Sequence, residues 1–255
     1  MEKPAPMFDK FLPVVVPEGL PGEEFLEDVR RILASKQLTN GAYVRRFEEA
    51  AAAYLGVDPC VAVSSCTSGL LLVLKALDLQ GEVILPSFTF HATAHAVVWN
   101  GLKPVFADCD AKTFCIDPQQ VRAKLSPGTA AILAVHLFGN PAAVKELEDI
   151  AAEMEIPLVF DAAHAFGSRS RGKHIGGFGS AEVFSFSPTK LVVAGEGGLI
   201  ATGDARLAER LRTARNYGDA GNYDPQMLGV NARMSEIHAA LALRNMMGVD
   251  ARIDR

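Results

Sequence analysis

The chain has 255 residues, of which 49% are hydrophobic and 22% charged, the balance of an ordinary globular protein. This composition excludes a disordered or fibrous chain. The formal net charge of −5 and the sequence pI of about 5.7 make a nucleic-acid partner a poor expectation, and they favour a small metabolite instead. The length suits one large domain or two small ones.

Export and membrane signals are not expected in this sequence. Its longest apolar stretches fall far short of the roughly 18 to 20 residues that cross a bilayer, and the first ten residues, MEKPAPMFDK, lack the apolar core of a signal peptide. The four cysteines, at positions 60, 66, 109 and 115, form no C-x-x-C pair and are predicted to be reduced and mostly buried. We therefore expect a cytoplasmic protein that does not contact the membrane.

Two amphipathic helices are predicted first, over residues 23–35 and 43–56, the second ending at Gly56. Short apolar strands then alternate with helices. The predicted strands are CVAV, EVILP, KPVFADCD, AAILAVHLFG, IPLVFDAAH, AEVFSFS and GGLIATGD. The helices among them are SGLLLVLKALD, HATAHAVVWNG, PQQVRAKLS, AAVKELEDIAAEME and ARLAERLRTARN. Continuous apolar strands predict an α/β fold with a mainly parallel sheet and helices on both faces.

The end of the chain, residues 235–255, is predicted to be one helix that is still running at the last residue, with no glycine or proline to close it. A long helix that stops in the middle of its pattern normally leads into further structure. We therefore expect a following domain that is absent from this chain.

Two familiar motifs are incomplete. Residues 167–173 match the phosphate loop G-x-x-x-x-G-K, but His174 follows where Ser or Thr would bind magnesium, so a polar hairpin is favoured. His91 and His95 have the spacing of a helical zinc site, yet HATAH lacks the glutamate base and no third ligand is evident. We expect no metal site.

A third pattern predicts an anion site. Residues 64–69 lie between an apolar strand and an apolar helix, where backbone N–H groups and the positive end of the helix can hold a phosphate. The hydroxyls of Thr67 and Ser68 would add donors. Ser and Thr also serve as ordinary helix caps, so this pattern alone leaves both interpretations open.

Two charged residues follow later apolar strands. Asp161 ends the strand in VFDAAHAFG, and the carboxyl ends of parallel strands are where open sheets bind ligands. Lys190 comes just after the strand in AEVFSFSPTK, where partial burial can lower its pKa toward nucleophilic use. A loop carboxylate and a solvated lysine are the alternatives for these positions.

Together, a phosphate loop, a strand-end carboxylate and a later lysine follow the order found in pyridoxal 5′-phosphate enzymes of the aspartate aminotransferase superfamily. The segments TNGAYVRRFE, VSSCTSGLLLVLKAL, LPSFTFHATAHAV, VFDAAHAFG, FSFSPTK, GEGG and GVNARMSEIHAAL resemble, in order and spacing, the motifs of DegT/StrS-type nucleotide-sugar aminotransferases. The resemblance runs from about Phe11 to the last residue. It implies an aspartate aminotransferase-like large domain.

Carried over position by position, the resemblance implies that Lys190 forms the imine link with the cofactor and that Asp161 pairs with its pyridine nitrogen. Phe90 matches the aromatic residue that stacks on the ring, and His164 matches a position near the ring oxygen. Asn231 matches an asparagine that completes the phosphate site of a neighbouring subunit, so a homodimer with shared active sites is implied. Three further positions match phosphate contacts: Thr67, Ser68 and Ser185.

The sequence also departs from the family pattern. Cys66 occupies a position where many members have glycine, which a backbone contact to phosphate tolerates. Family members usually continue into a small C-terminal domain, and nothing here matches it. The resemblance thus predicts the N-terminal segment and large cofactor-binding domain over residues 1–245, and the start of a truncated small domain over residues 246–255.

The activity implied is transamination with pyridoxal 5′-phosphate. An amino acid, glutamate or glutamine, would give its amino group to the cofactor, which would pass it to a keto group on a nucleotide-activated deoxysugar in amino-sugar biosynthesis. Two alternatives stay open. One is a sugar dehydratase, against which Lys190 argues because those relatives use histidine at that position. The other is a truncated, non-catalytic chain that binds the cofactor or a partner subunit.

Overall fold

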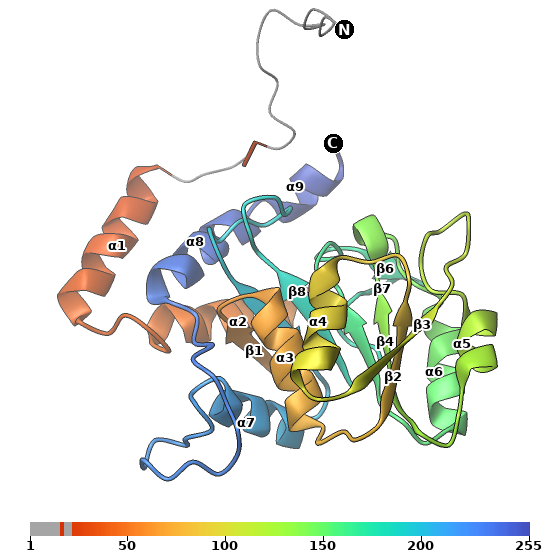
Figure 1. Cartoon of the computed structure of the whole chain (residues 1–255). Coiled ribbons are helices and arrows are strands. Elements are labelled where there is room, and N and C mark those ends of the chain that lie inside the picture. The colour runs from red at the N-terminus through yellow and green to blue at the C-terminus, as the bar shows by residue number, and fades with distance from the viewer. Residues whose placement is uncertain (1–15, 18–21) are drawn as a thin grey trace, which may run out of the picture.

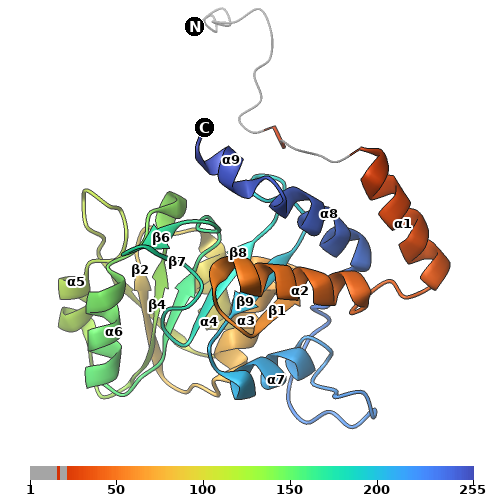
Figure 2. The same ribbon diagram turned by 180° about the vertical axis from the view of Figure 1, so that it is seen from behind.

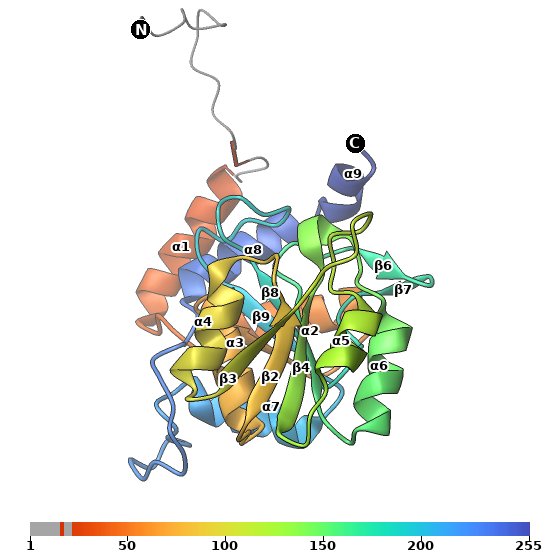
Figure 3. The same cartoon turned by 45° about the vertical axis from the view of Figure 1, so that its right-hand side comes forward.

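The structure, a computed structural model, describes residues 16–17 and 22–255. The expected start of the family resemblance, near Phe11, lies outside the described residues, as does most of the predicted N-terminal segment. The centre of the molecule is a seven-stranded sheet with the order β1-β9-β8-β5-β4-β2-β3 (Figure 1; Figure 3). Its strands are β1 Cys60–Val63, β2 Glu82–Pro86, β3 Lys103–Ala107, β4 Thr129–Val135, β5 Leu158–Asp161, β8 Ala181–Ser185 and β9 Gly198–Ala201.

The sheet is mainly parallel, as predicted. The neighbours β8, β5, β4, β2 and β3 all pair in parallel, whereas β9 is antiparallel to both β1 and β8. Strands covered on both faces are mostly apolar, and β1, β5, β8 and β9 are buried at every residue, including Asp161 in β5 and Glu182 in β8. The parallel strands end together at one edge of the sheet.

Helices cover both faces (Figure 1; Figure 2). Alternate residues of β1 show this division: Val61 and Val63 pack in the cluster formed with α3, α4 and α7, whereas Cys60 and Ala62 pack on the other side with Phe47 of α2. Helices α5 and α6 cover the far half of that second side. The helices are α1 Glu23–Ser35, α2 Ala42–Leu55, α3 Cys66–Ala76, α4 His91–Trp99, α5 Pro118–Lys124, α6 Val144–Glu153, α7 Ala205–Ala214, α8 Glu236–Met246 and α9 Val249–Ile253.

The predicted helices and strands are present except at the end of the chain, although the predicted strand AAILAVHLFG continues past β4 into a 3₁₀ turn over Leu137–Gly139. The expected helices from residue 23 to residue 216 agree with the structure to within two residues at each end. The polar hairpin is present as β6 Arg169–Ser170 and β7 Lys173–His174. All four cysteines are free, and three of them are buried. In the described part of the chain, no helix is long and apolar enough to cross a membrane.

The prediction of one continuous helix over residues 235–255 is wrong. Helix α8 ends at Met246, and α9 begins at Val249 after Gly248, whose φ of −131° is not helical. Glycine has a low helix propensity, so the helix can break at this residue and tertiary contacts determine the path of the chain. Val249 is buried in the hydrophobic cluster between α2 and the sheet, and the Tyr54 hydroxyl donates to Asp250 at 2.8 Å. The domain boundary between residues 245 and 246 stays a prediction.

A buried carboxylate joins α8 to the start of α2. Glu236 is 3% exposed and accepts hydrogen bonds from the backbone N–H groups of Gly41, Tyr43 and Val44 at 2.8–3.0 Å. These N–H groups have no partner within α2, and a negative charge at a helix N-terminus is stabilising. Gly41 is required here because a Cβ atom would lie 2.5 Å from a Glu236 oxygen.

Glu236→Ala is therefore expected to lower the free energy of unfolding by about 3 kcal/mol, since it leaves several buried donors without an acceptor. Urea unfolding measures the loss. The matched control is Glu27→Ala on α1, whose exposed carboxylate pairs with Arg30 and Arg31 and should contribute less than about 0.5 kcal/mol. Equal stability of the two variants would contradict the role of Glu236.

Candidate active site

A cavity of about 400 Å³ opens at the edge where the parallel strands end. Val135 of β4, Asp161 of β5 and Ser185 of β8 line it from the strands, and the first turns of α3 and α4 close it from one side. This is the position and size expected of a small-molecule site in a parallel sheet. Six of the eight predicted site residues line it: Thr67, Phe90, Asp161, His164, Ser185 and Lys190.

Asp161 lies at the floor of the cavity and is only 4% exposed. The Thr93 hydroxyl donates to its Oδ2 at 2.8 Å, and the Ala163 N–H donates to its Oδ1 at 3.1 Å. The Cys66 thiol lies 3.8 Å from the same Oδ1. These donors hold the side chain in one orientation, in which the carboxylate lines the cavity.

Lys190 follows β8 in a turn closed by its own N–H, which donates to the Ser187 carbonyl at 3.1 Å. Burial lowers the pKa of the Lys190 amine, and the neighbouring groups Cys66 and Asp161 oppose that effect. An amine with a lowered pKa spends more of its time unprotonated and nucleophilic. The solvated surface lysine considered as the alternative is therefore not what the structure shows.

The first turn of α3 forms one end of the cavity. Ser65 caps the helix, accepting from the Ser68 N–H at 3.1 Å, and Ser65 and Thr67 both line the cavity. Strand β9 comes very close here, because a Cβ atom on Gly198 would lie 2.5 Å from the Ser65 carbonyl carbon. A helix N-terminus with hydroxyl groups beside it is a favourable place for a phosphate.

Phe90 and His164 lie toward the mouth of the cavity. Phe90 is the N-cap residue of α4 and is 63% exposed, with its ring centroid 3.9 Å from that of His91; an exposed aromatic ring of this kind can stack on a planar ligand. Burial lowers the pKa of His164, and the positive charge of Lys190 acts in the same direction. His164 also lies nearly parallel to the Phe138 ring, with 6.0 Å between the ring centroids.

Two predicted residues do not line the cavity. The Ser68 hydroxyl accepts from the Ser65 N–H at 3.1 Å and donates to the Ser65 carbonyl at 2.8 Å, completing the cap of α3. Asn231 is exposed, and its backbone forms an antiparallel bridge with Asn216, away from the cavity. Their roles as phosphate contacts stay predictions.

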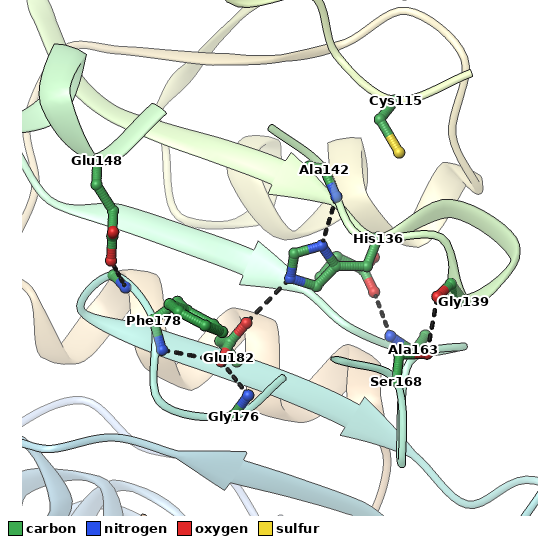
Figure 4. Close-up of polar contacts among 12 residues, drawn as sticks. Cys115, His136, Gly139, Ala142, Glu148, Ala163, Ser168, Gly176, Phe178 and Glu182 are labelled. Carbon is green, nitrogen blue, oxygen red and sulfur yellow. Dashed lines mark hydrogen bonds and ion pairs between the residues drawn. The ribbon is translucent and has the colours of Figure 1, made fainter. Parts of the chain in front are cut away.

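The wall of the cavity also contains a buried histidine that was not predicted. His136, at the end of β4, lines the cavity and accepts from the Ala142 N–H through Nδ1 at 3.0 Å, so its Nε2 carries the proton and donates to Glu182 at 3.0 Å (Figure 4). Glu182 also accepts from the N–H groups of Gly176 and Phe178. The position of His136 toward the carboxyl end of the predicted strand AAILAVHLFG was the signal that could have identified it.

The cavity thus combines a half-buried amine, a buried carboxylate, a helix N-terminus with hydroxyl groups beside it and an exposed aromatic residue. A phosphorylated, planar, electrophilic cofactor matches all four. The amine can attack its carbonyl carbon, the carboxylate can hold a proton on a ring nitrogen, and the aromatic ring can stack on it. Among the described residues, no cluster of His, Cys, Asp and Glu could hold a metal ion.

Comparisons with known proteins identify relatives of this chain. The chain is 34% identical over 253 residues to an Escherichia coli protein named dTDP-4-amino-4,6-dideoxy-D-glucose transaminase, covering 98% of this chain and 68% of that protein. It is 37% identical over 222 residues to the UDP-N-acetyl-3-dehydro-alpha-D-glucosamine 3-aminotransferase of Acidithiobacillus ferrooxidans, covering 86% and 60%. The crystal structure of DesI with its TDP-sugar product superposes with a TM-score of 0.92 at 45% identity, covering 97% of this chain and 64% of DesI.

The chain therefore spans about two thirds of the length of these relatives. The fold of this chain, a mainly parallel sheet covered on both faces by helices, is the aspartate aminotransferase-like fold expected from the sequence. The sequence profile of one family matches residues 21–255, which is nearly the whole described chain. On this match, and on relatives above 30% identity, the chain belongs to the DegT/DnrJ/EryC1/StrS aminotransferase family.

Proposed function

We propose that this chain carries the cofactor-binding half of a transamination site that uses pyridoxal 5′-phosphate and aminates a keto group on a nucleotide-activated deoxysugar. The observation that carries the proposal is the convergence of half-buried Lys190 and buried Asp161 on one cavity. Membership of the aminotransferase family supports the reaction class.

The residues of the cavity fit this cofactor. Thr67, Ser185 and the N-terminus of α3 would hold its phosphate, and the exposed Phe90 ring would lie against its pyridine ring. Lys190 would bind it covalently and then move a proton at the α-carbon of the amino donor, while Asp161 would keep the ring nitrogen protonated. When bound, pyridoxal 5′-phosphate supplies an electron-accepting ring and an aldehyde that carries the amino group.

The substrate class is proposed from the relatives. One is named for a dTDP-linked 4-amino sugar and another for a UDP-linked 3-amino sugar, so the two differ in nucleotide and in the carbon that carries nitrogen. What they share is an amino sugar attached to a nucleoside diphosphate. We propose that class for this chain, with glutamate or glutamine as the amino donor.

The experiment separates the two halves of the reaction. The purified protein is loaded with pyridoxal 5′-phosphate, and glutamate or glutamine is added while the visible absorption of the lysine-bound cofactor is followed. Loss of that band with release of the keto acid supports the donor half. A panel of dTDP- and UDP-linked keto sugars is then added, and the aminated product is sought by mass spectrometry. A stable band with both amino donors would overturn transamination.

Asn231 gives a prediction about assembly. If it completes the phosphate site of a partner subunit, Asn231→Ala should weaken cofactor binding about tenfold, and wild-type affinity should fall as dimers dissociate on dilution. Cofactor titrations at several protein concentrations, combined with sedimentation, measure both effects. Asn222→Ala, which alters another exposed asparagine shortly before Asn231, is the control. A monomer that binds the cofactor equally tightly at every concentration would contradict the shared site.

A further inference from the structure

Behind Asp161 lies a short chain of hydroxyl groups that the proposed reaction does not use. Thr93 of α4 has a side chain with no solvent exposure, and its Oγ1 lies 2.8 Å from Asp161 Oδ2. The Oγ1 of Thr89, in the loop before α4, lies 2.8 Å from that of Thr93. Thr89 also lines the cavity, so the chain runs from the cavity wall to the buried carboxylate.

The numbers of donors and acceptors on these groups fix the direction of the hydrogen bonds among them. An ionised carboxylate can only accept, so the Thr93 hydroxyl must donate to Asp161. Having used its single proton, Thr93 can only accept from Thr89. The order of donation is therefore Thr89 to Thr93 to Asp161, and each bond favours the charged carboxylate.

The first turn of α4 also carries Phe90, the residue expected to stack on the cofactor ring. Phe90 caps α4, and the Thr93 N–H donates to the Phe90 carbonyl at 3.1 Å. The two residues are three positions apart, so their relative placement is set by one turn of backbone. An aromatic face for the cofactor ring and a donor for the carboxylate below are thereby fixed as one unit.

We propose that Thr93, supported by Thr89, is a positioning residue that keeps Asp161 charged and aimed at the ring nitrogen of the cofactor. The proposal rests on the proposed function, because it needs pyridoxal 5′-phosphate in this cavity. Thr93 itself does not line the cavity. It acts through the carboxylate, whose other oxygen is held separately by the Ala163 N–H.

Other charged groups around Asp161 do not replace this contact. Lys190 and His164 line the same cavity and respond to the carboxylate's charge, but neither has a hydrogen bond to it in the structure. Cys66, from α3, faces Oδ1 rather than Oδ2, and burial together with the charge of Asp161 raises the pKa of its thiol, so it stays neutral. Removing the Thr93 hydroxyl should therefore favour proton uptake by the carboxylate as pH falls.

The experiment measures the dissociation constant of pyridoxal 5′-phosphate between pH 5.5 and pH 8.5 in four variants. Thr93→Val removes the hydroxyl with little change of shape, Thr93→Ser keeps it, and Thr89→Val removes the outer member. Thr202→Val is the matched control, because it deletes another buried hydroxyl, which donates to the Ser180 carbonyl at 2.7 Å away from the site. Circular dichroism confirms that each variant is folded at the temperature used.

Thr93→Val is expected to weaken binding about tenfold near the acid end of the range and less than about threefold near pH 8, moving the acid limb of the profile up by about one unit. Thr93→Ser should restore the wild-type profile, and Thr89→Val should show a smaller displacement in the same direction. Thr202→Val should leave the profile unchanged even if it melts earlier.

A Thr93→Val profile that coincides with wild type would overturn the positioning role while leaving the proposed function intact. The same shift in Thr202→Val would also overturn it, because the effect would then be one of stability. If the wild-type protein forms no visible band with the cofactor, both the proposed function and this inference fail together.

Discussion

Lys190→Ala is expected to abolish the visible absorption that pyridoxal 5′-phosphate gives with the wild-type protein, and to slow any transamination by about 10⁴-fold or more. The reason is that Lys190 is the lysine of the cavity and that burial lowers the pKa of its amine. Borohydride should bleach the wild-type band and leave the cofactor attached to the peptide that contains Lys190, as mass spectrometry can show.

The control for this result is Lys173→Ala, because Lys173 is an exposed residue of the β6–β7 hairpin and does not line the cavity. That variant should keep both the band and the label on Lys190. Recovery of the borohydride label on another lysine in the wild-type protein would show that Lys190 has been given the wrong role.

Asp161→Asn is expected to keep the cofactor bound, with an affinity lowered by at most about tenfold, but to slow the half-reaction with the amino donor by about 10²- to 10³-fold. An amide cannot hold a proton on the ring nitrogen by charge, whereas the buried carboxylate can. Binding is less affected because the lysine and the phosphate contacts remain. Stopped-flow absorption with glutamate gives the rate, and titration gives the affinity.

Asp117→Asn is the matched change outside the site. Asp117 caps α5 by accepting from the Gln119 N–H at 2.8 Å, and asparagine caps helices about as well. Its half-reaction should match that of wild type. A near-normal rate in Asp161→Asn would instead mean that the ring nitrogen needs no charged partner in this protein.

The sheet and its covering helices were predictable because most strand residues are apolar and buried, in short runs that alternate with helical patterns. The sequence CVAV is buried at every residue in β1, and the apolar positions of residues 23–35 correspond to an observed helix. The final helix was mispredicted for two reasons. The low helix propensity of Gly248 disfavours a continuous helix only weakly, and the contacts of Val249 and Asp250 with α2 cannot be seen in the local sequence pattern.

The candidate site was predictable only in part. Asp161 and Lys190 follow recognisable strands, so the edge of the sheet at which they meet could be inferred from topology. Thr93 could not be assigned in the same way, because its partner Asp161 comes from another element and the contact depends on three-dimensional packing. For His136 the strand pattern pointed to the cavity, but its pairing with Glu182 depends on packing as well. Ser68 presents a different difficulty. A serine at a helix N-terminus can cap the helix or bind an anion, and the sequence pattern is the same in both cases.

The antiparallel strand β9 has a consequence for how the protein is made. In the described sheet, β1 lies at one end and its neighbour is β9, which is among the last strands along the chain. On the ribosome, residues 60–63 therefore emerge long before the segment with which they pair. The apolar β1 stays unpaired while most of the sheet is synthesised. Contacts so distant in sequence slow folding, because loop closure must precede the pairing that rewards it. A nascent chain halted before residue 198 should consequently expose β1 to chaperones, and release should follow once β9 has left the exit tunnel.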